Sequence, residues 1–218
     1  MQAPTTEIEG EQNEYIKEFM EAEGWNSNGR WNKIDEYLEL PLKERVKMEE
    51  DRPWDIRKYM VGKYAWAIPN ERAIKMLVEL GPIVEVGAGI GYWAHLVTEA
   101  GGDIRAYDSL VKTYKESCKD PWFPVKRGGV EKARMKGRNL FLCWPPYSEK
   151  MATRCLENCT GQYVIYVGEG EGGCTGDEDF HEHLDKHFKM VTEFAIPQWW
   201  GLHDDFQVWE RTNGLSSR

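Results

Sequence analysis

The sequence predicts an α/β fold in which a mostly parallel sheet of seven strands carries helices on both faces and follows an N-terminal helical extension. From residue 81 onward, short β-branched and aromatic runs alternate with stretches of helical periodicity, and such alternation builds a parallel sheet. A glycine-rich turn joins the first run to a helix. The last two runs, VTEFAI and DFQVWER, are separated by a short loop, which predicts a hairpin and an antiparallel final strand.

The chain divides into a core and an appendage. Residues 1–10 are polar, contain Pro4 and lack periodicity, so we expect a disordered tail. Residues 11–80 form the helical extension or lid, residues 81–211 the core, and residues 212–218 a second tail. With 218 residues, of which 41% are hydrophobic, the chain can bury one sizeable core.

Helical spacing and helix caps predict the extension. The apolar residues of its first helix share one face: Tyr15, Ile16, Phe19 and Met20. A second helical stretch covers 31–46 with a break at Pro41, and a third covers 53–60. Asn70 is a suitable N-cap for a helix over 71–80.

Strands and helices of the core follow in turn. We expect strands near 82–86, 103–107, 123–126, 139–143, 162–167, 190–196 and 205–210. We expect helices near 91–100, 109–119, 147–159 and 177–189. Ligands of such sheets lie outside the carboxyl ends of the parallel strands, so the loops at that edge are the candidate sites.

The stretch IVEVGAGIGYWAHLVTEAGGDIRAYD carries the strongest functional signal. Gly87, Gly89 and Gly91 let the backbone turn tightly and approach a ligand. The helix that follows presents free N–H groups, which favour an anionic or carboxylate-bearing ligand. Asp108 ends the next strand, where a carboxylate can accept both hydroxyls of a ribose. The pattern predicts a nucleoside-cofactor site.

The spacing of the glycines indicates which cofactor. A dinucleotide fingerprint needs a small residue at the position of Tyr92, which is too bulky for close packing over a pyrophosphate. The pattern E-x-G-x-G-x-G, beginning at Glu85, instead resembles motif I of the class I S-adenosylmethionine (SAM) methyltransferases. The resemblance runs from near Tyr64 to Arg211 and implies a Rossmann-like methyltransferase sheet with SAM as cofactor.

The resemblance also implies cofactor contacts. The glycine backbone would line the methionyl part of SAM, Glu85 would contact its ammonium or orient the loop, and Asp108 would hold the ribose. Upstream, Gly62–Leu80 looks like the segment before motif I in seven-strand protein-lysine methyltransferases, where an aromatic such as Trp66 or Tyr64 covers the cofactor. The predicted cofactor-binding residues are Trp66, Glu85, Gly87, Ala88, Gly89, Gly91, Tyr92, Asp108, Ser109 and Cys143.

The segment CWPPY is a candidate acceptor site. It resembles the N-P-P-Y signature of methyltransferases that modify amino groups of adenine or glutamine, in which the aromatic stacks on the target. Trp144 replaces the Asn or Asp of that signature, and an indole donates one hydrogen bond and accepts none. Trp144, Pro145 and Pro146 are therefore predicted substrate-binding residues and Tyr147 a catalytic one, unless the segment is only a structural turn.

Two later loops complete the predicted site. In GEGEGGCTGDED, Glu169 or Glu171 binds a cationic substrate or takes a proton, or the loop is merely solvated. In PQWWGLHDDF, Trp199 and Trp200 offer aromatic walls and His203, oriented by Asp204, a titratable group; alternatively the tryptophans only cover the sheet edge. The predicted catalytic residues are Tyr147, Glu169 and His203, and Glu171, Trp199 and Trp200 join the predicted substrate-binding set.

The distribution of charged residues and histidines indicates which classes of ligand the protein can bind. The net charge of −9 disfavours a general polyanion binder. A basic segment either holds phosphates of a nucleotide or RNA or is a solvated loop: Lys126, Arg127, Lys132, Arg134, Lys136 and Arg138. His183 and His187 lie four apart without the glutamate of H-E-x-x-H, so no metal site is expected.

The sequence therefore predicts a SAM-dependent methyltransferase that modifies an N or O nucleophile. Its acceptor is left open between RNA, a protein side chain and a small amine. The alternatives are a non-catalytic SAM-binding partner protein and, opposed by Tyr92, an NAD-dependent oxidoreductase. No apolar run approaches the roughly 18 residues of a membrane span. Five cysteines without C-x-x-C spacing favour a reducing, cytoplasmic location. The oligomeric state is left open.

Overall fold

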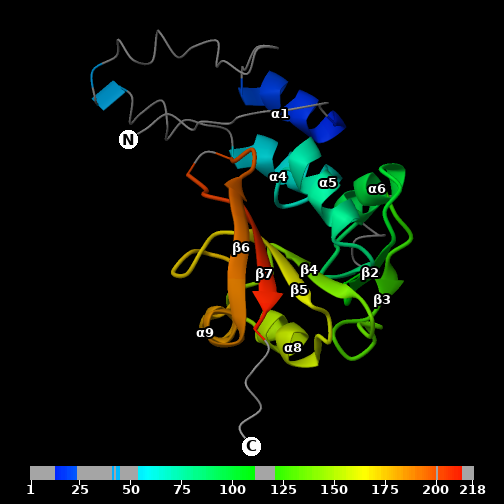
Figure 1. The fold of residues 1–218 in the computed structure, drawn as a ribbon. Coiled ribbons are helices and arrows are strands. Elements are labelled where there is room, and N and C mark those ends of the chain that lie inside the picture. Colours follow the sequence, from blue (N-terminus) through cyan, green and yellow to red (C-terminus); the bar gives the residue numbers. More distant parts are fainter. Residues whose placement is uncertain are drawn as a thin grey trace, which may run out of the picture.

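A computed structural model describes residues 13–23, 41, 43–44, 54–110, 121–199 and 201–212 of the protein (Figure 1). Most of the helical stretch expected over 31–46 and most of the helix expected over 109–119 lie outside the described residues. So do the tail expected over 1–10, nearly all of the one expected over 212–218, and the candidate substrate residue Trp200.

The described core is a single seven-stranded sheet with the strand order β3-β2-β1-β4-β5-β7-β6. The strands are β1 (Ile83–Val86), β2 (Ile104–Asp108), β3 (Lys126–Arg127), β4 (Asn139–Cys143), β5 (Tyr163–Gly168), β6 (Phe188–Ala195) and β7 (Asp205–Arg211). From β3 to β5 all neighbours pair in parallel, whereas β7 is antiparallel to both β5 and β6. The predicted fold class, including the antiparallel last strand, is confirmed.

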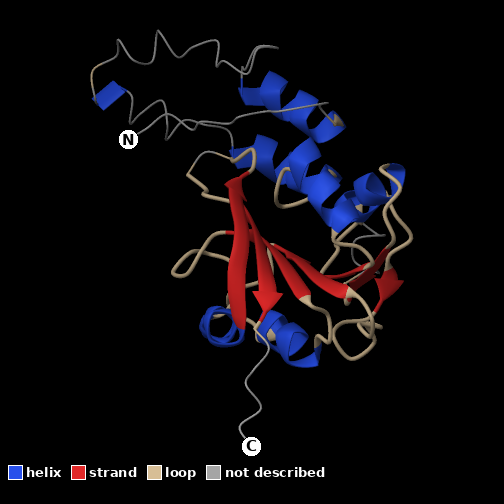
Figure 2. Ribbon diagram, in the orientation of Figure 1, coloured by secondary structure: helices blue, strands red, loops and turns tan. Residues whose placement is uncertain are grey.

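Helices cover both faces of this sheet (Figure 2). Helices α5 (Glu71–Glu79) and α6 (Tyr92–Glu99) pack on one face over Phe141 and Ile165, in a cluster that also holds Trp93. Helices α8 (Met151–Asn158) and α9 (Glu178–His187) pack on the opposite face. Alternate residues of a strand point to opposite faces, so both faces of the central strands are apolar.

Local chemistry sets several element boundaries. The side chain of Asn70 accepts a hydrogen bond from the Ala73 amide at 2.9 Å, so the predicted N-cap of α5 is confirmed. Strand β3 pairs only over Lys126–Arg127, later than predicted, and Pro124 just before it has no N–H for the ladder. Helix α8 begins at Met151 rather than near 147, since Pro146 forms a bridge with Thr175 and residues 147–150 form a turn.

The N-terminal extension shares a hydrophobic cluster with the core. Helices α1 (Glu14–Glu23) and α4 (Trp54–Lys63) lie beyond the carboxyl ends of the parallel strands (Figure 1). The four apolar residues predicted for one face of the first helix are all buried: Tyr15, Ile16, Phe19 and Met20. They pack with Tyr64, Tyr92 and Trp199, so the extension covers the sheet edge where ligands of such folds bind.

Candidate cofactor and acceptor site

The glycine loop after β1 has room for a ligand at one position and packs tightly at another. Gly89 has a φ of 55°, and a Cβ built there would meet no atom within 4 Å. Gly91 has a φ of 82°, and a Cβ there would lie 2.7 Å from Cβ of Phe123 and 2.9 Å from Cγ2 of Val125. Gly91 is therefore required for packing at the start of α6, whereas Gly89 faces open space.

Asp108 at the end of β2 is bound to this loop. Its Oδ2 accepts a hydrogen bond from the Gly89 amide at 2.9 Å, and its Oδ1 accepts one from the Leu110 amide at 2.6 Å. The side chain is buried, which raises the pKa of Asp108, and the two amide bonds oppose that rise. A carboxylate has about four lone-pair sites, so two remain for hydroxyl donors beside Gly89.

Glu85 lies in β1 with an unsatisfied carboxyl group. It is buried, and its Oε2 has no hydrogen-bond partner among the described residues. Burial, and next the charge of Asp108, raise the pKa of Glu85 to about 8. A buried carboxylate without partners is costly unless a cation pairs with it. An ammonium group bound beside Oε2 would supply the missing partner.

The other predicted cofactor residues occupy varied positions. The Tyr92 hydroxyl accepts a hydrogen bond from the Tyr15 amide at 3.2 Å, so this side chain packs under the extension. Ala88 donates its amide to the Tyr107 carbonyl at 3.1 Å. Ser109 is exposed. Cys143 is half-buried at the end of β4, and burial, followed by the charges of Glu85 and Asp204, raises the pKa of its thiol.

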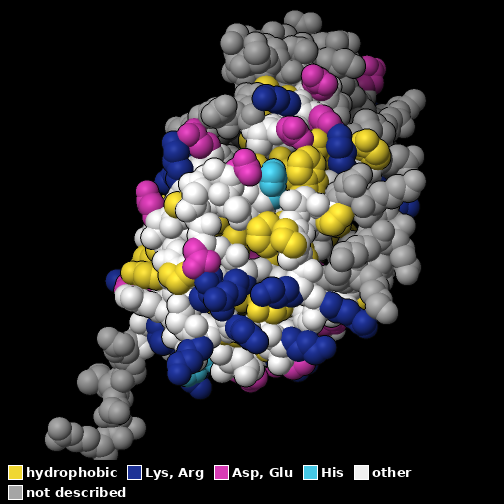
Figure 3. All heavy atoms as spheres, turned by 90° about the vertical axis from the view of Figure 1, so that its right-hand side faces the viewer, with side chains coloured by type: hydrophobic (Ala, Val, Ile, Leu, Met, Phe, Trp, Pro, Cys, Tyr) yellow, Lys and Arg dark blue, Asp and Glu magenta, His cyan; other side chains and the backbone are white. Residues whose placement is uncertain are grey.

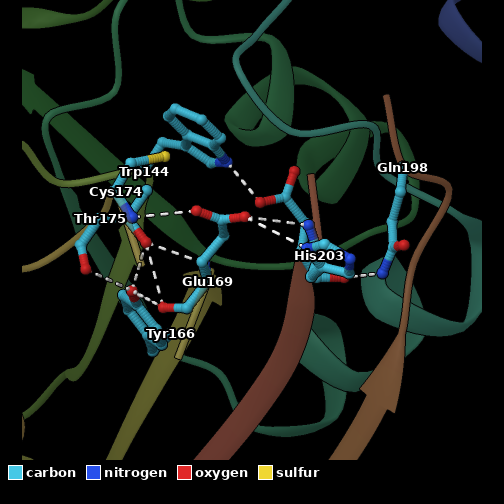
Figure 4. A network of polar contacts seen from close by, with 8 residues as sticks. Trp144, Tyr166, Glu169, Cys174, Thr175, Gln198 and His203 are labelled. Atoms are coloured by element: carbon cyan, nitrogen blue, oxygen red, sulfur yellow. Dashed lines mark hydrogen bonds and ion pairs between the residues drawn. The ribbon is translucent and has the colours of Figure 1, made fainter. Parts of the chain in front are cut away.

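Trp144 of CWPPY has a satisfied indole and an unusual backbone. Its φ is 52°, the one positive value at a non-glycine position among the described residues. Its Nε1–H donates to Oδ1 of Asp204 at 2.7 Å (Figure 4), and its ring stacks on Trp66 with centroids 5.3 Å apart. The proline turn is pinned, since the Gly176 amide donates to the Pro145 carbonyl at 2.8 Å and Pro146 bridges to Thr175.

Asp204 is a candidate site residue that sequence reasoning assigned only an orienting role. It is fully buried, and its Oδ2 has no hydrogen-bond partner among the described residues. Burial raises its pKa to about 7, and the bond from Trp144 opposes this rise. A carboxyl group that titrates near neutral pH suits proton transfer. In the sequence nothing separates Asp204 from its neighbour Asp205.

Glu169 and His203 form a different contact from the expected one. The Glu169 carboxylate accepts hydrogen bonds from the amides of Cys174 at 2.9 Å and His203 at 3.1 Å (Figure 4). Burial raises the pKa of Glu169, but these bonds outweigh it and the pKa lies below its ordinary value. The His203 side chain is 83% exposed. Glu169 therefore links the two loops, and the expected orienting acid, Asp204, bonds to Trp144 instead.

The remaining predicted substrate residues lie at the surface or under the extension. Tyr147 and Glu171 are exposed. Trp199 is buried, and its Nε1–H donates to the Tyr15 hydroxyl at 3.0 Å while its ring meets Phe19 edge-on. In this arrangement Trp199 anchors the extension to the loop before β7.

Arg57 on α4 is a second residue that the sequence did not single out. Its guanidinium carbon lies 5.3 Å from the ring centroid of Trp66 and 5.2 Å from that of Trp144. Its Nε and Nη2 are buried and have no hydrogen-bond partner among the described residues. No local pattern marks this arginine, because the residues around it come from distant segments.

The basic segment before β4 is mostly exposed. Figure 3 shows Lys and Arg side chains gathered on the face that carries the β3 edge of the sheet. The exposed members of the segment are Lys126, Arg127, Lys132, Arg134 and Lys136. Arg138 differs: it is buried, bonds to the Ile83 carbonyl at 3.0 Å and pairs with Asp103 at 2.7 Å, so it supports the sheet.

The described residues include neither a metal-binding cluster nor a membrane-spanning helix. No three or more His, Cys, Asp or Glu side chains of the described part are grouped to hold a metal ion. None of the described helices is long and apolar enough to cross a membrane.

Comparison with known proteins identifies the fold. No protein-family model and no curated protein matches the sequence. Magnesium protoporphyrin IX methyltransferase from Synechocystis PCC 6803, solved with bound SAM, is similar in structure, with a TM-score of 0.51 and 12% identity over 81% of this chain and 94% of that chain. The same enzyme with bound SAH gives a TM-score of 0.50 and 12% identity over 81% and 97% of the two chains. The chain thus has the fold of class I SAM-dependent methyltransferases.

Proposed function

We propose that the protein is a SAM-dependent methyltransferase that modifies an N or O nucleophile. The proposal depends on two buried acids, one on each of the neighbouring strands β1 and β2, beside the glycine loop with its open position at Gly89. Glu85 has an unpaired oxygen and Asp108 is bonded to the Gly89 amide. The fold is similar to that of a SAM-bound methyltransferase. The support for SAM as the cofactor of this chain comes from Glu85, Gly89 and Asp108 themselves.

The residues present fit SAM. Glu85 would pair with the methionyl ammonium, the backbone at Gly89 would lie along the methionyl group, and Asp108 would accept the ribose hydroxyls. Bound SAM supplies a methyl group on a positively charged sulfur, the reactive part of the chemistry. The role of the chain is then to hold the acceptor in position and to manage its proton.

We propose Asp204 as the residue that accepts this proton. Strand β4 lies beside β1, where Glu85 pairs with Phe141, and Trp144 just after β4 bonds to Asp204, so β4 connects the cofactor side to the acceptor side. The free Oδ2 of Asp204 can accept a hydrogen bond from an N–H or O–H of the acceptor. Glu169 is less suited, because both its oxygens already accept hydrogen bonds and its pKa is lowered. His203 and Tyr147 are exposed.

Transfer from methyl-labelled SAM tests this proposal. The full chain is incubated with RNA, with protein and with small aromatic amines, acids and phenols, and the label in each acceptor is counted. We expect one class to be labelled and Asp204→Asn to lower the rate by about 10²–10⁴-fold, the usual contribution of a general base. Binding of SAH should be unchanged by this isosteric substitution.

The control is Asp185→Asn, which removes an exposed acid on α9. It should leave both transfer and SAH binding unchanged. If SAH binds but no acceptor class is labelled, the result favours the alternative function, a non-catalytic SAM-binding partner protein. If transfer persists in Asp204→Asn at the wild-type rate, Asp204 is not the base.

A further inference from the structure

Four side chains from distant segments meet at the acceptor side of the site. They are Arg57 of α4, Trp66 after it, Trp144 after β4, and Asp204 before β7. Trp144 is central, since it contacts Arg57 through its ring, Trp66 by stacking and Asp204 through its indole N–H. The sequence singled out Trp66 and Trp144, but no sequence motif marks Arg57.

The guanidinium of Arg57 has donors that the described protein does not use. Nε and Nη2 are buried without a hydrogen-bond partner in the described part of the chain. Buried donors nearly always have a partner, because leaving water without one is unfavourable. The fork of Arg N–H groups matches the two oxygens of a planar carboxylate. The free donors therefore indicate where a carboxylate of a ligand binds.

Asp204 adds an unpaired hydrogen-bond acceptor to the cluster in which Arg57 has unpaired donors. Its Oδ2 has no partner among the described residues, and it forms no ion pair with Arg57 there although both contact Trp144. Two complementary groups that do not satisfy each other can be satisfied by one ligand. Such a ligand carries an anionic group for Arg57 and an N–H or O–H donor for Asp204.

The surroundings favour a monoanion on an aromatic ring. Among the described residues, Arg57 is the one cation over the two indole rings. A single guanidinium balances the one charge of a carboxylate, whereas it would leave half of the charge of a phosphate dianion uncompensated. The two indole rings provide flat apolar surface, and Trp66 remains 47% exposed.

We propose that the methyl acceptor is a small aromatic carboxylate, and that Arg57 determines this specificity. Its carboxylate binds Nε and Nη2 of Arg57, its ring lies against Trp66 and Trp144, and its N–H or O–H bonds to Oδ2 of Asp204. The identity of this molecule as a methyl acceptor rests on the proposed function, whereas its binding to Arg57 does not.

The test compares two probes of similar shape, one with a carboxylate and the other with a neutral amide. 4-Hydroxybenzoate and 4-hydroxybenzamide have the same ring and hydroxyl, and each is titrated calorimetrically into the full chain with and without saturating SAH. We expect the benzoate to bind roughly tenfold or more tightly than the amide, the order expected of hydrogen bonds to a charged group. This comparison on the wild type needs no variant to fold.

Variants then assign the preference to Arg57. Arg57→Met should abolish it, and Arg57→Lys, which keeps the charge but not the fork, should retain part of it. The matched control is Arg72→Met: Arg72 is exposed on α5 and lies over the Phe194 ring at 4.0 Å, so it is also an arginine on an aromatic. This variant should keep the full preference, and circular dichroism checks that each variant is folded.

Each outcome has a defined meaning. Equal or undetectable binding of the two probes to the wild type overturns the proposal, as does a preference that survives Arg57→Met. Tighter binding of phenyl phosphate or of a short single-stranded RNA, lost in Arg57→Met, would replace the carboxylate with a phosphate-bearing acceptor. Failure of SAH to bind would instead strike the cofactor assignment, and the probe comparison without SAH would still decide the role of Arg57.

Discussion

A carboxyl group that is buried with an unpartnered oxygen holds its proton to higher pH, and Glu85 is such a group among the described residues. Its pKa is raised to about 8 by burial and then by Asp108. Since the folded-state pKa lies above the ordinary value of 4.5, the protonated form stabilises the fold. That stability is fully present below pH 4.5 and is lost as the pH rises toward 8.

Glu85→Gln isolates this effect, because glutamine is neutral at every pH. We expect the free energy of unfolding of the wild type, minus that of the variant, to fall between pH 5 and pH 8 by up to about 1.4 kcal/mol per pH unit. Urea unfolding at several pH values measures the difference. A difference that stays constant over this range would mean that Glu85 ionises normally in the folded protein.

At the scale of elements, the glycine loop combines a packing position with a ligand position. Gly91→Ala places a methyl group against Phe123 and Val125 at the start of α6 and also strains a positive φ. We therefore expect it to lower the free energy of unfolding by about 2–5 kcal/mol, the sum of overpacking and backbone strain. Gly89→Ala meets no neighbour and should cost only the strain of its positive φ, about 1–2 kcal/mol.

The two variants should differ in SAM binding in the opposite sense. The methyl group of Gly89→Ala points into the space that we assign to the cofactor, so its affinity for SAM should drop more than that of Gly91→Ala. Unfolding and calorimetry on the same samples give both quantities. If both variants were fully folded under the titration conditions and Gly91→Ala lost more affinity for SAM than Gly89→Ala, the cofactor would not lie at Gly89.

At the scale of the whole molecule, the sequence predicted the sheet but did not predict the cluster that we propose as the acceptor site, here called the acceptor cluster: Arg57, Trp66, Trp144 and Asp204. Six of the seven strands, all except β3, were predicted to within two residues at each end because their apolar runs are bounded by glycines, prolines and polar turns. The buried face of α1 also followed from helical spacing. These features depend on residues that are close together in the sequence, so the local pattern of apolar and polar residues predicts them.

The acceptor cluster depends on contacts between distant segments. Arg57 and Trp144 are far apart along the chain, and their contact follows from α4 lying over the edge of the sheet. The CWPPY motif singled out Trp144 in the sequence, but the partner of this tryptophan, Asp204, lies in the loop before β7. Trp199, predicted as an aromatic wall, instead bonds to Tyr15 of the extension.

The central claim is that the site around Gly89 binds SAM, and calorimetric titration of the wild type and Asp108→Ala with SAM, SAH and NAD⁺ tests it most directly. We predict that the wild type binds SAM and SAH but not NAD⁺. In Asp108→Ala the affinity for SAM should fall by about 1–3 kcal/mol, or about 5–150-fold, the cost of removing a buried hydrogen-bond partner. Asp185→Asn should bind as the wild type does. No binding of SAM or SAH to the wild type, or unchanged affinity in Asp108→Ala, would contradict the assignment of this site.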